Sequence, residues 1–78
     1  MWFLIVLMMA APTSDVAGRR GAYILPFGTD DLVCAQRAAF ALQQPGTIVA
    51  QCVLGEGAAH QLEQDWLSGR MPVPRPTP

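Results

Sequence analysis

The sequence predicts a small α/β domain, with a small α+β arrangement as the alternative, in which a strand–helix–strand unit is followed by a second helix. Four stretches carry this prediction: two strand-like segments at residues 21–27 and 47–55, a helical pattern between them at residues 29–44, and a second helical pattern at residues 57–69. The expected organisation is an apolar leader over residues 1–18, a domain over residues 19–70 and a proline-rich tail over residues 71–78.

The first eleven residues, MWFLIVLMMAA, are all apolar, and Pro12 ends the run. A membrane-spanning helix needs roughly 17–25 such residues, whereas a run of about 10–14 is typical of a signal peptide or a buried segment. Val16 and Gly18 are small enough for the positions before a cleavage site. We therefore expect residues 1–18 to be a signal peptide cleaved after Gly18, or a short anchor in which residues 1–11 contact the membrane.

Two features oppose a signal peptide. No Lys or Arg precedes the apolar run, and Arg19 and Arg20 lie on its far side, where export tolerates positive charge poorly. The alternative is that residues 2–7 form a buried strand or helix of the domain. We prefer the leader because a half-buried strand alternates apolar and polar side chains, and this segment does not.

The segment GAYILPF at residues 21–27 has strand character. Tyr23, Leu25 and Phe27 fall on one face, and Ala22 and Ile24 fall on the other. Because Pro26 has no N–H to donate to a neighbouring strand, we expect an edge strand.

The helix predicted at residues 29–44 begins with Thr29 as its N-cap and ends before Pro45 and Gly46. Its apolar face is mostly alanine and includes Cys34. The strand TIVAQCVLG that follows is apolar on both faces, so both are expected to be covered. Strand, helix and strand joined by short links predict a parallel pair with a right-handed crossover.

Cys34 and Cys52 are the two cysteines of the chain, and we predict that they form a structural disulfide. Cys34 lies on the helix face that meets the sheet, and Cys52 lies in the strand beside it. Closing a loop of this size contributes roughly 3 kcal/mol in the chain-entropy model. If the chain is cytosolic, the alternative is two free buried thiols. A metal site with His60 and Glu63 is a weaker alternative, because zinc ligands usually come in closely spaced pairs.

Two large apolar residues of the first helix, Val33 and Phe40, lie on its otherwise polar side. Leu62 and Trp66 form an apolar stripe on the second helix. We expect the second helix to cover Val33 and Phe40. If it does not, Val33, Phe40, Leu62 and Trp66 are the candidate surface for an unknown protein partner or for self-association.

Composition argues against several classes of function. Net charge is −1 and there is no Lys, so neither a basic stripe for nucleic acid nor a phosphate-loop lysine is present. The stretch LGEGAAH lacks the third glycine of a dinucleotide fingerprint, and Glu56 would repel a pyrophosphate. His60 has no second catalytic candidate beside it in the sequence. We expect no catalytic residue, no metal and no cofactor.

The combination of a leader, an aromatic strand, a helix cysteine and a strand cysteine is similar to that of many small exported bacterial or phage-encoded proteins of unknown function. The resemblance covers roughly Tyr23 to Cys52 and implies no functional residue. The sequence thus predicts an exported protein, periplasmic or secreted, that acts by binding or as a structural element rather than as an enzyme. The alternatives are a membrane-associated protein with an uncleaved N-terminal helix, and a cytosolic interaction protein whose apolar N-terminus is buried.

Overall fold

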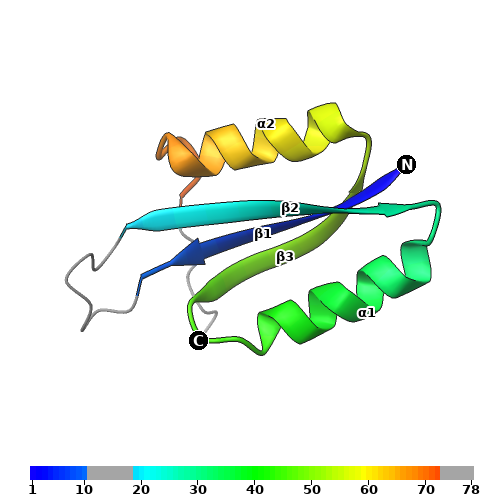
Figure 1. Ribbon diagram of the computed structural model, residues 1–78. Coiled ribbons are helices and arrows are strands. Elements are labelled where there is room, and N and C mark those ends of the chain that lie inside the picture. Colours follow the sequence, from blue (N-terminus) through cyan, green and yellow to red (C-terminus); the bar gives the residue numbers. More distant parts are fainter. Residues whose placement is uncertain (11–18, 73–78) are drawn as a thin grey trace.

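The computed structural model describes residues 1–10 and 19–72, and it shows a small α+β fold with a three-stranded antiparallel sheet between two helices (Figure 1). In chain order the elements are β1 (Trp2–Met9), β2 (Arg20–Gly28), α1 (Asp31–Leu42), β3 (Thr47–Leu54) and α2 (Glu56–Leu67). The predicted strand–helix–strand unit and the second helix are therefore confirmed.

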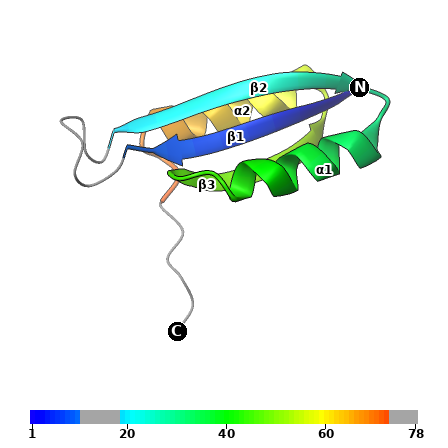
Figure 2. The same ribbon diagram turned by 60° about the horizontal axis from the view of Figure 1, so that its bottom comes forward.

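The strand order is β2-β1-β3, and β1 pairs antiparallel with both neighbours. The predicted right-handed crossover from β2 through α1 to β3 is present (Figure 2), so β2 and β3 run in the same direction. The expectation that these two strands pair directly is wrong, because β1 lies between them. The most apolar segment of the chain takes the central position, where neighbours flank both of its edges and helices cover both of its faces.

The apolar N-terminal segment is the centre of the core. Leu4, Ile5, Val6 and Leu7 have between 0% and 1% of their surface exposed. Leu4 and Val6 belong to the cluster on the α1 side, and Ile5 and Leu7 to the cluster on the α2 side. Alternation is missing from the sequence because both faces of β1 are covered, so our argument from missing alternation to a leader was wrong. The structure agrees with the alternative of a buried strand.

Cleavage after Gly18 stays a prediction, since residues 11–18 lie outside the described part of the chain. The fold described here contains β1, however, and is therefore the fold of the uncleaved chain. From residue 73 onward, the proline-rich tail also lies outside the described residues. Within residues 1–10 and 19–72, neither helix has the length and apolar character that crossing a membrane would require.

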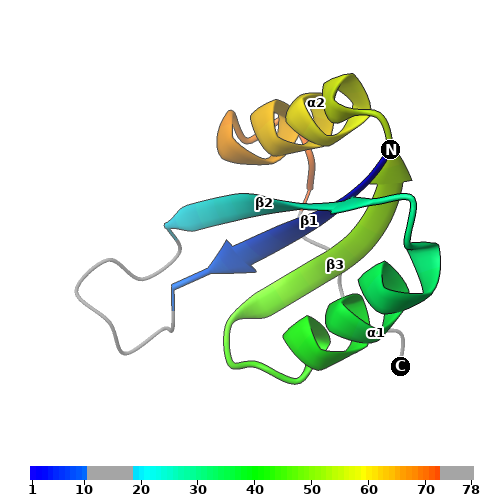
Figure 3. The ribbon, with the colours of Figure 1, turned by 45° about the vertical axis from the view of Figure 1, so that its right-hand side comes forward.

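The two helices cover opposite faces of the sheet (Figure 3). α1 packs mainly over β3 and β1, and α2 packs mainly over β1 and β2. The expectation that the second helix covers Val33 and Phe40 on α1 is therefore wrong. The physical reason is that β1 needs cover on both faces, and α2 provides the cover on the side that α1 leaves open.

The local signals place most element ends within one or two residues of their observed positions. β2 is an edge strand with an exposed Pro26, as predicted. The N-cap of α1 is Asp30 rather than Thr29, because an Asp30 carboxylate oxygen accepts a hydrogen bond from the Val33 amide at 3.1 Å. The helix ends at Leu42, shortly before Pro45.

Candidate functional site

The disulfide predicted between Cys34 and Cys52 is present and joins the buried face of α1 to β3. The two Cα atoms are 6.2 Å apart, and the cysteines are separated by 18 positions in the sequence. Cys34 is fully buried and Cys52 packs against the same cluster. Since both sulfurs are used in the bond, the alternatives of two free thiols and of a cysteine-based metal site do not describe this structure.

His60 is an exposed residue of α2, on the other side of the sheet from Cys34. Its ring nitrogens lie 3.2 Å from a Glu56 carboxylate oxygen and 3.6 Å from one of Glu63. These are pairs one helical turn apart on a solvated surface, and such pairs typically contribute only a few tenths of a kcal/mol. In this structure His60 forms surface contacts within its own helix.

The exposed apolar side of α1 consists of Val33, Arg37 and Phe40, which we call the Phe40 flank. Val33 is 43% exposed and Phe40 is 53% exposed. The spacing of four and three residues places all three side chains on one side of the helix. Because the crossover is right-handed, this side faces across the sheet toward β2. The flank therefore lies beside the face of β2 that α1 covers only partly.

Arg37 gives the Phe40 flank its chemical character. Its guanidinium carbon lies 4.8 Å from the centroid of the Phe40 ring, within the range of a cation–π contact. One of its terminal nitrogens, Nη1, is buried and has no hydrogen-bond partner among the described residues. Our sequence reasoning overlooked Arg37, although its position between Val33 and Phe40 at helical spacing was a usable signal.

Trp66 and Leu62 do not belong to the exposed surface that the sequence predicted. Trp66 has no exposed area, and Leu62 packs against the same core cluster. The Trp66 indole N–H lies 3.0 Å from the carbonyl oxygen of Gly21 and 3.2 Å from that of Met8, so it hydrogen-bonds to both β2 and β1. The predicted four-residue surface is thus divided by the sheet, and only Val33 and Phe40 are exposed.

Arg20 covers Trp66 on its outer side. Its guanidinium carbon lies 4.3 Å from the centroid of the indole, and its Nη1 donates hydrogen bonds to the backbone carbonyls of Trp66 and Met71. From the sequence, Arg20 was considered only as a positive charge that opposes a signal peptide. In the structure Arg20 connects the first residue of β2 to the end of α2.

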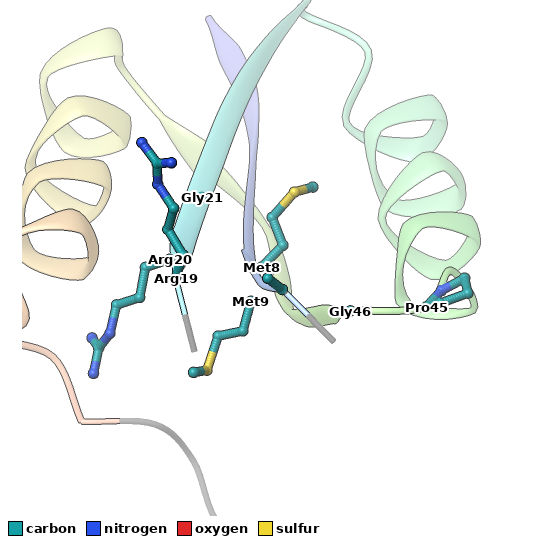
Figure 4. Close-up of a pocket in the computed structure, with 8 residues that line it drawn as sticks. Met8, Met9, Arg19, Arg20, Gly21, Pro45 and Gly46 are labelled. Carbon is teal, nitrogen blue, oxygen red and sulfur yellow. The ribbon is translucent and has the colours of Figure 1, made fainter. Parts of the chain in front are cut away.

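A cavity of about 350 Å³ lies where β1 ends and β2 begins (Figure 4). Met8 and Met9 supply much of its apolar wall, Arg19 and Arg20 line it at the start of β2, and Pro45 and Gly46 close the side toward β3. None of the predicted site residues lines this cavity. The Arg20 guanidinium hydrogen-bonds to two backbone carbonyls. The second cation that lines this cavity is Arg19, whose side chain makes no hydrogen bond to the described residues.

Comparisons with protein families, with curated proteins and with solved structures found no match for this chain.

Proposed function

We propose that the protein is a small disulfide-stabilised binding domain of an oxidising, exported compartment, and that the Phe40 flank contacts a protein partner. The proposal assigns the chain a binding role and no reaction. Of the four surface residues that the sequence indicated, the proposed binding surface retains Val33 and Phe40, and it adds Arg37.

The observation that carries this proposal is the exposure of Phe40 beside a stacked arginine. A phenylalanine that is 53% exposed leaves apolar surface in water, which costs about 25 cal/mol for each Å². Aromatic residues and arginine are enriched in the parts of protein interfaces that contribute most to binding. A partner that covered Phe40 would remove this cost, and a carboxylate of the partner would pair with the positive charge of the Arg37 guanidinium.

The compartment is supported by the disulfide. Such bonds persist in oxidising environments, and a domain with a small core gains the most from them. In the proposed protein, residues 2–9 stay in the sheet, since removing them would remove its central strand. Contact of residues 1–11 with a membrane would require the buried side chains of β1 to leave the core.

The burial of β1 favours a second candidate, a cytosolic interaction protein that keeps the same fold with its N-terminus in the core. The two candidates differ in thiol state and location. Intact mass should be measured on protein from the native host after alkylation without reduction. For the exported domain we expect protein in an extracytoplasmic fraction whose mass does not change on alkylation, because both sulfurs are in the disulfide. Protein in the cytosol with two alkylated thiols would support the second candidate.

The binding surface can be tested by photo-crosslinking in the native host. A benzoylphenylalanine at position 40 should give a defined adduct, and the same residue at Gln36, on the outer side of α1, should not. An excess of wild-type protein should compete the adduct away, whereas a Phe40→Ser competitor should be about tenfold weaker, as expected for loss of an aromatic anchor. Equal adducts from both positions, or equal competition, would contradict the proposal.

A further inference from the structure

We propose that a second copy of this chain binds at the free edge of β3, so that two domains form one continuous six-stranded sheet related by a two-fold axis. This interface uses β3 and the side of α1 opposite to the Phe40 flank. It is therefore independent of the function proposed above, and both surfaces can be occupied at once.

From Ala50 to Leu54, the outer edge of β3 has none of the features that normally prevent strand pairing. Proteins protect edges with charged side chains, prolines and bulges that disturb the edge. The eight residues of β3, TIVAQCVL, include no charge and no proline, and the only irregularity in its pairing lies near its first residues. The other edge strand, β2, begins with Arg20 and contains the exposed Pro26. Among the described residues, the sheet is thus open to pairing on the β3 side only.

The pairing of β1 with β3 shows which backbone groups point outward. The Gly55 amide donates to the Met1 carbonyl at 2.9 Å, and Gly55 and Met1 continue the register in which Phe3 faces Val53. Hydrogen-bonded positions alternate along an antiparallel pair, so Val53 and Gln51 direct their backbone groups toward β1. The N–H and C=O groups of Ala50, Cys52 and Leu54 consequently face the free edge.

The side of α1 beyond β3 is apolar and exposed as well. It carries Leu32, Ala35, Ala39 and Leu42, which we call the alanine flank. Leu32 is 66% exposed, Leu42 is 52% exposed, and both alanines are exposed. A right-handed crossover and a rotation of about 100° per residue place these residues on the side of the helix that points past the free edge of β3, whereas Gln36 points away from the sheet. Asp31 in the first turn is the one charged residue on this side of α1.

With a two-fold axis perpendicular to the sheet, one partner covers both the free edge of β3 and the alanine flank of α1. Antiparallel pairing of β3 with its copy sets the two strands about 4.8 Å apart. α1 packs mainly over β3 and β1, so the same two-fold axis would bring the two copies of α1 side by side. Packed helices are usually separated by 8–10 Å, and small residues such as Ala35 and Ala39 permit this approach.

The charges of β3 and α1 are also compatible with a second copy of the chain as the partner. A strand without charge pairs with itself without repulsion, and the two antiparallel copies of α1 would bring opposite helix ends together. A partner strand of another protein would need to supply both a neutral edge and a matching apolar helix at the same spacing. The second copy supplies both by symmetry.

The first test is the mass in solution of the full chain, measured by sedimentation equilibrium at concentrations up to about 1 mM, the upper range for weak association. We expect a monomer–dimer equilibrium. Gln51 has an exposed side chain in the middle of β3. Gln51→Lys and Gln51→Glu should each raise the dissociation constant about fivefold through like charges across the axis, and an equal mixture of the two should restore the dimer. Gln36→Lys, which adds the same charge on the outer side of α1, should have no effect.

Hydrogen exchange provides a readout that needs no variant. On dimerisation the amides of Ala50, Cys52 and Leu54 should become protected, whereas those of Gln51 and Val53 should be slow already in the monomer. Ala35→Glu should weaken the dimer at least tenfold, because it places a carboxylate between the helices. The proposal would be overturned if the chain stayed monomeric. It would also be overturned if Gln51→Lys left the dissociation constant of the dimer unchanged while Phe40→Ser abolished the dimer.

Discussion

At the scale of single residues, two contacts fix the end of the central strand. The Trp66 indole N–H bridges the carbonyls of Met8 and Gly21, and the Met9 amide donates to the Gly46 carbonyl at 2.9 Å. Gly46 has a φ of +85°, and a Cβ atom at this position would lie 2.8 Å from the Met9 carbonyl oxygen. The close approach of the turn to β1 therefore depends on the absence of a side chain at Gly46.

Gly46→Ala should lower the free energy of unfolding by about 1–3 kcal/mol, because the new methyl group meets backbone and the left-handed φ is unfavourable for alanine. Gly57→Ala is the matched control. Gly57 lies in α2, and a Cβ atom there would meet nothing within 4 Å. The control should be neutral or stabilise by up to about 1 kcal/mol. Urea unfolding of both variants measures the difference, and equal effects would contradict the role of Gly46.

At the scale of elements, the two helices are attached to the sheet by different means. α1 has a mostly alanine face with little apolar area, and the Cys34–Cys52 bond ties it covalently to β3. α2 has no covalent link, but it buries the large ring of Trp66 completely. The disulfide thus supports the helix whose buried side chains are the smaller of the two.

Loss of the disulfide should therefore destabilise the domain by about 3 kcal/mol, as expected for a loop of this length. Thermal unfolding of the wild type, with and without reductant, measures this change. The double variant Cys34→Ala/Cys52→Ala should melt near the reduced wild type and should not respond to reductant. If the melting temperature of Cys34→Ser equalled that of the oxidised wild type, the bond would have no stabilising role.

At the scale of the whole molecule, the fold depends on a strand that the sequence presents as a leader. β1 supplies four of the most deeply buried side chains and contributes to the clusters on both faces of the sheet. It also separates β2 from β3, so without it the two remaining strands have no partner in this topology. Removal of residues 1–18 would therefore remove the central strand of this fold.

A chain that starts at Arg19 should not adopt this fold. We expect loss of the cooperative thermal transition and a larger hydrodynamic radius than that of the full chain, because two separated strands and two helices cannot bury a common core. Circular dichroism and size-exclusion chromatography of the two chains provide the comparison. A cooperative transition in the shorter chain would show that β1 is dispensable.

The sequence by itself determined the local elements from β2 to α2, the edge character of β2 and the pairing of Cys34 with Cys52. Each of these depends on short-range chemistry: helical spacing, the missing N–H of Pro26, and a face of α1 that must meet the sheet. Even the N-cap differed by only one residue, from Thr29 to Asp30.

Only the tertiary structure decided where the apolar segment lies and which faces the helices cover. A membrane and a protein core both exclude water, so eleven apolar residues satisfy either environment, and no local pattern separates them. Periodicity likewise shows that Trp66 and Phe40 are on apolar stripes but not which surface each one meets. That choice was made by β1, whose burial on both faces placed α2 opposite α1, buried Trp66 and left Phe40 exposed.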